Sequence, residues 1–341
     1  MNSDLSSQQV KDIGEQGLLE KLQRFCPPEI IGDDAAVLET APGQSLVVTT
    51  DVLVDGVHFS NLTTSPEDAG WRAAAANLSD LAAMGASPLG ITVGLGLPGE
   101  LRVSWVERLY QGMTECLQKY NNTPIVGGDV VRSPVTTLAI TAFGQVNPSQ
   151  IIRRSTAVVG DAIVVTGVHG ASRAGLELLL HPELGQNLNK EEKTALIRAH
   201  QRPQPRLDVL PILWKILTSN SQFSIAGMDS SDGLADAIIQ ICHASGVGAV
   251  LEHRQIPIPK TFNHWLTPDQ ALKYALYGGE DFELVLCLPQ ELASALVQHL
   301  GEVAAIAGRI TAGSTVILHD EQKKFPDQVL NLSQGFQHFG Q

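Results

Sequence analysis

The sequence predicts a mixed α+β fold in two lobes. Three observations lead to this prediction: a length of 341 residues, strand-like and helix-like segments that alternate along the first half, and a change of composition near residue 150. A chain of this length exceeds the usual size of one domain. We therefore expect an N-terminal domain over residues 1–150 and a C-terminal domain over residues 151–341.

Apolar runs and helix signals define the elements of the first half. We expect strands at 46–54, 88–98, 123–131 and 135–146, and helices at 66–85 and 101–120. Pro66 near the start and Gly85 at the end bound the first of these helices. Because only the polar segment Arg-Ser-Pro separates the last two strands, we expect them to form a hairpin.

The second half follows a junction at 145–161, which is rich in Pro, Ser and Asn. We expect strands at 162–167, 223–229, 246–252, 282–289 and 304–310, and helices at 171–180, 190–200, 233–245 and 290–300. No short-period repeat is present.

Composition narrows the class of protein. The chain has 23 basic and 36 acidic side chains and a net charge of −13, which argues against a nucleic-acid partner. A phosphorylated substrate stays possible, because divalent cations reverse the local charge at an acidic site. The four cysteines have no metal-type spacing, and neither a secretory signal nor an apolar run of about 18 residues is present. We expect a cytoplasmic protein without membrane partners.

Common nucleotide-binding motifs do not explain the sequence. The segment GLGLPG at 94–99 fits the dinucleotide-binding pattern, but Pro98 stiffens it and its first two glycines lie within an expected strand. Glycines that allow close strand packing are the better interpretation. The chain contains no Gly-Lys pair, so it has no Walker A motif, and it has no kinase catalytic loop of the His-Arg-Asp type.

Aspartates recur on turns and at the edges of apolar strands, where this residue is disfavoured. They are Asp33, Asp34, Asp51, Asp80, Asp129, Asp229 and Asp232. Each one alone is compatible with a turn or a helix cap. Asp80 is harder to explain in this way, because it lies inside an Ala-rich helix. Asp129 ends an apolar strand behind two glycines, where a backbone can approach a ligand closely.

Several converging carboxylates would repel one another strongly unless a cation lay between them. Mg²⁺ prefers oxygen ligands and combines one or two carboxylates with water and phosphate oxygens. The aspartates therefore predict a site for several Mg²⁺ ions and a phosphorylated ligand.

Other residues fit such a site. Gly127 and Gly128 can offer backbone N–H groups to a phosphate, and Arg153 and Arg154 can bind phosphate oxygens or form a solvated pair. His58 is either a substrate contact or a histidine packed at a strand end. Glu280 and Asp281 follow a second double glycine, and Trp71 is expected in the core.

Taken together, these motifs resemble the thiamine-monophosphate kinase family, within the larger group of ATP-binding proteins related to aminoimidazole ribonucleotide synthetase. The resemblance covers nearly the whole chain and depends on these segments: GE at 14–15, GDDAAV, TTD with VDGVHF, NLSDLAAMGA, GGDVVRSP, RRS with GD, MDSSDGL and GGEDFEL. It implies a homodimer in which the N-terminal sheet domains pair, and an ATP cleft completed by the C-terminal α/β domain.

The resemblance also implies roles for individual residues. The expected Mg²⁺ ligands are Asp34, Thr49, Thr50, Asp51, Asp80, Asp129, Asp229 and Asp232, with Asp33 as a further ligand or neighbour. The expected ATP contacts are Gly128, Asp129, Arg154 and Ser231, and the expected thiamine monophosphate contacts are His58, Glu280 and Phe336. The expected reaction is direct transfer of the γ-phosphoryl group of ATP to thiamine monophosphate, which yields thiamine diphosphate and ADP.

No general base is expected, because a phosphate monoester has a second pKa of about 6 and is already a nucleophile at neutral pH. Two alternatives remain. One is a related ATP-dependent synthetase; the selenophosphate branch would need a reactive Cys in a glycine-rich N-terminal segment, whereas Cys26 lies in RFCPPE. The other is a metal- and nucleotide-binding regulator without turnover, in which degraded metal positions would be expected.

Overall fold

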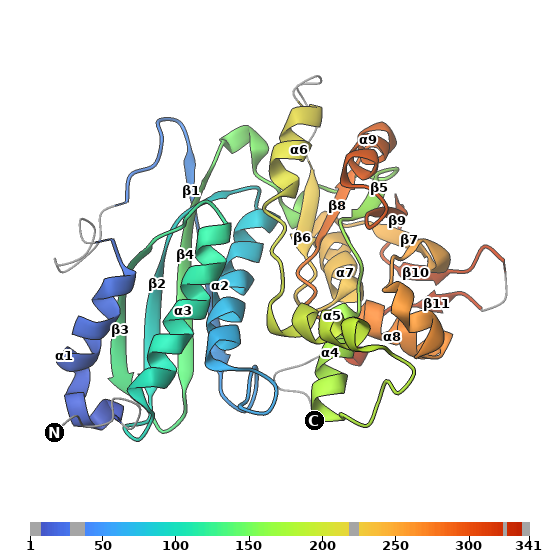
Figure 1. Ribbon diagram of the computed structural model, residues 1–341. Helices are drawn as coiled ribbons and strands as arrows, with labels where there is room; N and C mark the ends of the chain where they lie inside the picture. The colour runs from blue at the N-terminus through green and yellow to red at the C-terminus, as the bar shows by residue number, and fades with distance from the viewer. Residues whose placement is uncertain (1–7, 28–37, 218–224, 323–325, 336–341) are drawn as a thin grey trace. The chain divides into compact units, whose positions relative to one another are not determined.

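The computed structural model describes residues 8–27, 38–217, 225–322 and 326–335. The chain divides into two compact units, which are described separately here (Figure 1). Unit 1 comprises Met1–Leu81 and Ala86–Pro148, and unit 2 comprises Ala82–Gly85 and Ser149–Gln341. Both contain a sheet and helices, so the predicted mixed α/β class is confirmed.

Unit 1 contains a four-stranded sheet with the strand order β1-β4-β2-β3. Its elements are α1 (Val10–Leu22), β1 (Ser45–Val54), α2 (Pro66–Ala83), β2 (Ser87–Leu97), α3 (Val103–Lys119), β3 (Ile125–Arg132) and β4 (Thr137–Val146). The predicted helices and strands of this half are confirmed, whereas α1 was not predicted, because its apolar residues show only a weak helical period.

The predicted hairpin of β3 and β4 is wrong. Strand β2 lies between them, parallel to β3 and antiparallel to β4. The connecting segment instead passes the end of β2, where the Ser133 N–H donates to Leu97 O at 3.0 Å. Pro134 lacks an N–H group, which disfavours the short hydrogen-bonded turn that a hairpin needs.

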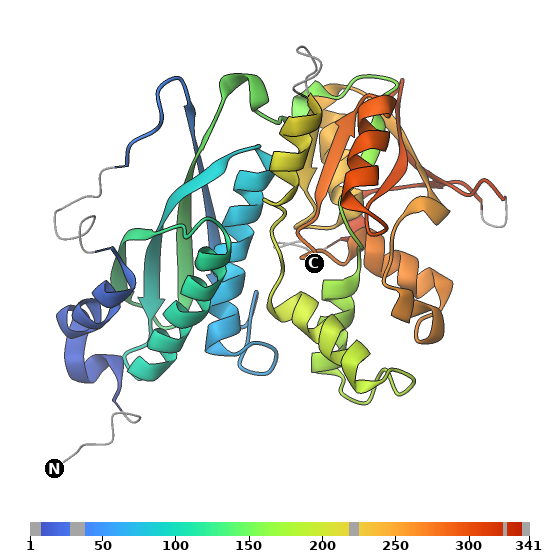
Figure 2. The same ribbon diagram turned by 45° about the horizontal axis from the view of Figure 1, so that its top comes forward.

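The sheet of unit 1 has two unlike faces. One face carries buried residues such as Leu53, Ile140 and Leu95 and packs against α2 and α3, which Figure 2 shows on one side of the sheet. On the other face of β1, Leu46, Val48 and Val52 are 54%, 53% and 47% exposed. Strand alternation therefore separates a core face from an open apolar face within this unit.

Unit 2 contains a seven-stranded sheet with the order β11-β10-β7-β9-β5-β8-β6. Its strands are β5 (Ala162–Val165), β6 (Ala226–Asp229), β7 (Gly248–Glu252), β8 (Leu284–Leu288), β9 (Ala305–Thr311), β10 (Val316–His319) and β11 (Gln328–Val329). Its helices are α4 (Ala171–Leu180), α5 (Lys190–Gln201), α6 (Val209–Leu217), α7 (Leu234–Ser245), α8 (Pro268–Tyr277) and α9 (Gln290–Leu300). The elements that were not predicted are α6, α8, β10 and β11.

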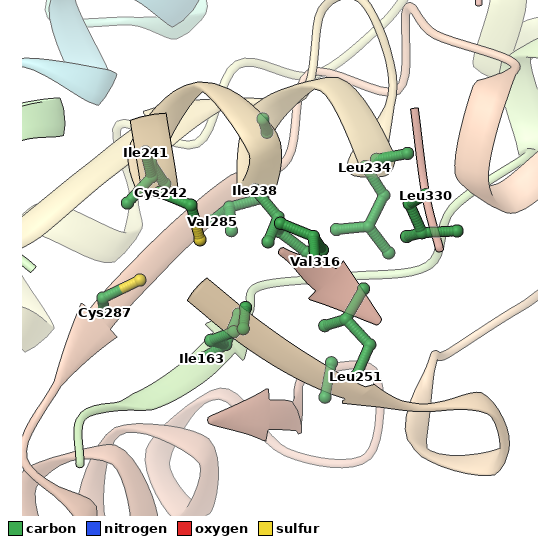
Figure 3. Packing of buried hydrophobic residues seen from close by; sticks show 14 of the residues in the cluster. Ile163, Leu234, Ile238, Ile241, Cys242, Leu251, Val285, Cys287, Val316 and Leu330 are labelled. Atoms are coloured by element: carbon green, nitrogen blue, oxygen red, sulfur yellow. The ribbon is translucent and has the colours of Figure 1, made fainter. Parts of the chain in front are cut away.

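The continuous apolar runs of β5 and β8 are buried along their whole length, and both are interior strands of the sheet. Alternate residues of each strand enter two different clusters, so both faces are covered. In one cluster, Leu234, Ile238 and Ile241 of α7 lie over Ile163 and Val285 (Figure 3). In the other cluster, side chains of α6 and α9 pack against the opposite face. The outcome is a three-layer arrangement of helices, sheet and helices.

Three loops lie close together at the ends of β5, β6 and β8. The antiparallel register aligns the ends of β5 and β6 with the start of β8. The loops at 166–170, 230–233 and 278–283 therefore lie together, and hydrogen bonds join them. The Ser230 N–H donates to Glu283 O at 2.9 Å, and the Glu280 N–H donates to Ser231 O at 2.6 Å.

Candidate functional site

Twelve of the predicted site residues fall within the described part of the chain. Asp33, Asp34 and Phe336 lie outside it. Seven of the twelve lie in unit 1 and five in unit 2.

In unit 1, β1 and α2 bring Thr49, Asp51 and Asp80 together. Thr49 and Asp51 lie two residues apart on the face of β1 that packs against α2. The Thr49 hydroxyl donates a hydrogen bond to the Asp80 carboxylate, which joins the strand to the helix. Both carboxylates keep partial exposure to solvent. This group therefore presents oxygen ligands from two regular elements.

The register does not bring Asp129 to this group. Cross-strand partners share a face, and the row that contains Asp129 consists of Asp129, Gly94, Ala139 and Val52. Because Val52 belongs to the open face, Asp129 lies on that face as well, as does Thr50, whose hydroxyl is 2.8 Å from that of Thr141. Three strand spacings, about 14 Å, separate the two edge strands β3 and β1. Asp51 and Asp129 of one chain therefore cannot bind the same ion.

The expectation that Asp129 ends its strand is also wrong. Strand β3 continues through Val130 and Val131 to Arg132, because β-branched residues suit a strand. Asp129 is tolerated there because it lies on an edge strand opposite Gly94, and its own Oδ1 accepts the Val130 N–H at 2.9 Å.

Packing alone requires a glycine at position 128. A Cβ atom there would lie 2.2 Å from Val93 O, which is backbone and cannot move aside cheaply. At Gly127 a Cβ would meet only the Thr92 methyl group at an ordinary 3.8 Å. Close strand approach therefore explains Gly128, whereas Gly127 has no such steric reason.

His58 is held at the end of β1. The Val54 N–H donates to His58 Nδ1 at 3.0 Å, and the His58 N–H donates to Val54 O at 2.9 Å. Because an N–H group can only donate, Nδ1 carries no proton and the neutral ring has its proton on Nε2. The ring is therefore fixed in one tautomer, with Nε2–H as its hydrogen-bond donor.

In unit 2, β6 ends at Asp229, and the loop that follows carries Ser231 and Asp232. Asp229 is 3% exposed, and its Oδ1 accepts the Ser231 hydroxyl at 3.0 Å. Asp232 is exposed in the turn that precedes α7. Gly233 has a φ of 108°, which favours glycine and lets the chain turn sharply into the helix.

Asp236, in the first turn of α7, was not among the predicted site residues. Burial and the charge of Asp232 raise its pKa, while Gln240 and the charge of Arg154 lower it. Asp236 therefore lies within electrostatic range of both Asp232 and Arg154. The spacing of three and four residues in MDSSDGLAD was the available signal, but an Asp in a first turn also stabilises the helix dipole.

The loop before β8 has a strained backbone. Glu280 and Phe282 have φ values of 59° and 52°, in the left-handed region that favours glycine. Strain of this kind costs of order 1–3 kcal/mol a residue and clusters at functional sites. Neighbouring side chains hold the loop: Asp281 accepts the N–H groups of Gly170 and Ser172 at 2.6 and 2.9 Å and so caps α4.

A nearly buried ion pair holds the end of the same loop, at Glu283. Glu283 and Arg206 are 15% and 13% exposed, and the Arg206 guanidinium donates to Glu283 at 2.5 Å. The Thr166 hydroxyl donates to the same carboxylate oxygen at 2.6 Å. Burial alone would lower the pKa of Arg206, but Asp208 and Glu283 raise it above the usual range. The guanidinium therefore stays charged.

The sequence was compared with known proteins. Residues 32–146 match the family model described as AIR synthase related protein, N-terminal domain, and residues 158–321 match the corresponding C-terminal domain. A curated thiamine-monophosphate kinase of Synechococcus elongatus is 52% identical over 336 residues, which cover 98% of this chain and 99% of that protein. This chain belongs to the thiamine-monophosphate kinase family.

Solved structures of the thiamine-monophosphate kinase family have the same fold. The enzyme from Stenotrophomonas maltophilia K279a is 34% identical, with a TM-score of 0.75 over 85% of this chain and 90% of that chain. The structure described as AaThiL complexed with AMPPCP and TMP is 30% identical, with a TM-score of 0.72 over 94% of this chain and 98% of that chain. The family resemblance seen in the sequence is therefore confirmed, and the family is one of kinases.

Two further findings bear on the chain as a member of this family. Over the ranges that the structure describes, no three His, Cys, Asp or Glu side chains lie close enough to hold a metal ion by themselves. Among the same residues, no helix combines the length and the apolar character needed to cross a membrane.

Proposed function

We propose that this chain transfers the γ-phosphoryl group of ATP to thiamine monophosphate and releases thiamine diphosphate and ADP. The observation that carries the proposal is the 52% identity, over 98% of the chain, to a curated thiamine-monophosphate kinase. The complex of AaThiL with AMPPCP, an ATP analogue, and TMP supports the same pair of substrates.

The acceptor needs no general base. A phosphate monoester has a second pKa of about 6, so a nucleophilic oxygen is present at neutral pH. The obstacle is repulsion between two anions, which positioning and electrostatic stabilisation must overcome. The acidic groups of the chain therefore act as ligands for cations, and none of them has to accept a proton.

Mg²⁺ fits the chemistry of both groups. Thr49, Asp51 and Asp80 in unit 1, and Asp229 and Asp232 in unit 2, offer only oxygen donors. Burial, and after it the charge of Asp232, raise the pKa of Asp236, so negative charge from Asp232 acts at this position. The described residues offer no set of three such ligands, so a bound ion would also need water and phosphate oxygens as ligands. Bound Mg²⁺ would neutralise the phosphates of both substrates.

The remaining predicted residues contact the two substrates. Arg154, Ser231 and the backbone of Gly128 bind the phosphates of ATP, and Asp129 would contact ATP through a bound Mg²⁺. His58, through Nε2–H, and Glu280, through its carboxylate, bind thiamine monophosphate. Asp33 and Asp34 are further Mg²⁺ ligands, and Phe336 packs on the thiamine part.

We also propose that the first domain, residues 1–150, pairs with a second copy of the chain. The open face of its sheet supports this, because Leu46, Val48 and Val52 are each about half exposed. Exposed apolar faces of this kind are typical of subunit interfaces. The use of ATP supports a cytoplasmic location.

The test is ³¹P NMR of the protein with ATP, Mg²⁺ and thiamine monophosphate, each omitted in turn. Thiamine diphosphate that forms only when all three are present supports the proposal. ADP that forms without the acceptor, or an absence of turnover, would contradict it.

A further inference from the structure

A buried histidine lies behind Glu280. His200, near the end of α5, has a side chain that is 3% exposed, and its Nδ1 is 3.5 Å from Glu280 Oε2. The same nitrogen is 3.2 Å from the hydroxyl of Ser172, which is also buried. The Glu280 side chain itself is 34% exposed. One side of this carboxylate therefore contacts the interior of unit 2, and the other faces solvent.

The chemistry of the contact orients the carboxylate. A carboxylate oxygen only accepts hydrogen bonds, so a proton on Nδ1 makes the contact attractive and lets the ring donate toward both Glu280 and Ser172. His200 is buried at a helix end and has little room to move. A long side chain such as Glu loses considerable rotamer freedom when it is held in one geometry.

The backbone of Glu280 is held as well. Its φ of 59° is unfavourable for a residue with a side chain, and its N–H donates to Ser231 O at 2.6 Å. The next residue, Asp281, is bound to the N–H groups of Gly170 and Ser172. Ser172 therefore contacts the loop twice, with its N–H at Asp281 and with its hydroxyl through His200.

We propose that His200 is a positioning residue that holds the Glu280 carboxylate ready to bind the cationic thiamine part of thiamine monophosphate. This inference rests on the proposed function. The Glu280 side chain loses its conformational entropy when the protein folds. Substrate binding therefore causes little further loss of entropy at this residue. Loss of His200 should therefore weaken the binding of thiamine monophosphate and leave the binding of ATP unchanged.

The experiment is a double-mutant cycle of H200A, E280A and the double variant, with KM measured for each substrate. We expect H200A to raise the KM for thiamine monophosphate about ten-fold and to change kcat and the KM for ATP less than three-fold. In the E280A background, H200A should have no further effect on KM. H200N, whose amide can still donate, should restore most of the wild-type KM.

A matched control separates positioning from loosening of the helix. Leu196 lies one turn earlier on α5, is 4% exposed and belongs to the hydrophobic cluster that contains Ala174 and Phe262. L196A should lower the Tm without raising the KM for thiamine monophosphate. Equal KM values for L196A and H200A would overturn the proposal, as would additive effects of H200A and E280A on KM.

The same cycle measured as the Tm of the substrate-free protein tests the pair without any substrate. Non-additive Tm changes support the contact between His200 and Glu280, and additive changes overturn it. A wild type that forms no thiamine diphosphate would instead overturn the proposed function. The two failures are therefore distinguishable.

Discussion

The two acidic groups of this protein are built in different ways. In unit 1, Thr49, Asp51 and Asp80 project from a regular strand and a regular helix, and a single side-chain hydrogen bond joins the two elements. In unit 2, Asp229 is the last residue of β6, whereas Ser231, Asp232 and Glu280 lie on loops at the ends of the strands, and Glu280 has a strained backbone.

The two groups differ in the contacts that hold their side chains in position. Regular elements position side chains through repeating geometry, so the unit 1 group needs few additional contacts. Loops have no such repeat, and in unit 2 the ion pair of Glu283 with Arg206 and the buried His169 and His200 hold them. We therefore expect substitutions at the unit 1 group to impair chemistry with little loss of stability, and substitutions in the supports of unit 2 to impair stability.

The largest expected effect is on turnover. D51N removes a negative charge that is proposed to bind Mg²⁺, so kcat should fall roughly a hundred- to a thousand-fold, measured by formation of thiamine diphosphate. The Tm should change little, because Asn fits the same space. D129N should also lower kcat strongly, because it removes another charge that is proposed to bind Mg²⁺.

E107Q is the matched control for charge in unit 1, because Glu107 forms a surface pair with Arg24 at 3.0 Å. It should keep wild-type turnover. Wild-type turnover in D51N would contradict the assignment of this group.

The next effect is on stability in unit 2. R206M leaves Glu283 without its charged partner in a nearly buried position, which should lower the free energy of unfolding by about 3–5 kcal/mol. The measurement is urea unfolding of both proteins.

R108M makes the same substitution in an exposed pair, since Arg108 is 50% exposed beside Glu67. We expect a loss of about 1 kcal/mol or less. Equal losses of unfolding free energy in R206M and R108M would contradict the stabilising role of the buried Arg206–Glu283 pair.

A pH effect should follow from His169. Burial lowers its pKa to about 4, although Gly167 O opposes the shift. In the unfolded chain the ring is protonated below about pH 6.5, so its contribution is present above that pH and is lost as pH falls through about 4. The loss should reach roughly 2–3 kcal/mol, and H169Q should remove it from unfolding curves measured between pH 7 and pH 4.

Asp281 should show the opposite sign. Burial and the charges of Glu283 and Glu280 raise its pKa to about 7, against two backbone hydrogen bonds that lower it. Its folded state holds a proton more strongly, so stability should fall as pH rises from about 4 to about 7, and D281N should abolish that fall. The same pH profile in H169Q and D281N would contradict both assignments.

The smallest expected effect concerns His58. H58A removes the proposed Nε2–H donor, so the KM for thiamine monophosphate should rise about ten-fold and the KM for ATP less than three-fold. Steady-state kinetics with each substrate varied provide the measurement. If the KM for ATP changed more than the KM for thiamine monophosphate, His58 would be assigned to ATP binding instead.

Much of this molecule could be predicted before the fold was seen. Apolar periodicity predicted α2, α3, α7 and α9 and the strands of unit 1, because local hydrophobic spacing is sufficient for such elements. The acidic motifs predicted the residue types of the site and the family. These inferences depend on neighbours in sequence, and the sequence contains that information directly.

The tertiary structure decided what depends on distant pairing. The insertion of β2 between β3 and β4 determined that Asp129 lies on a different face from Asp51. The support of the Glu280 loop comes from His200 and Arg206, about eighty residues earlier, and no local pattern connects them. The sequence by itself therefore determined which chemical groups the protein carries. Only the tertiary structure decided which of them meet, because strand order and burial arise from long-range packing of the whole unit.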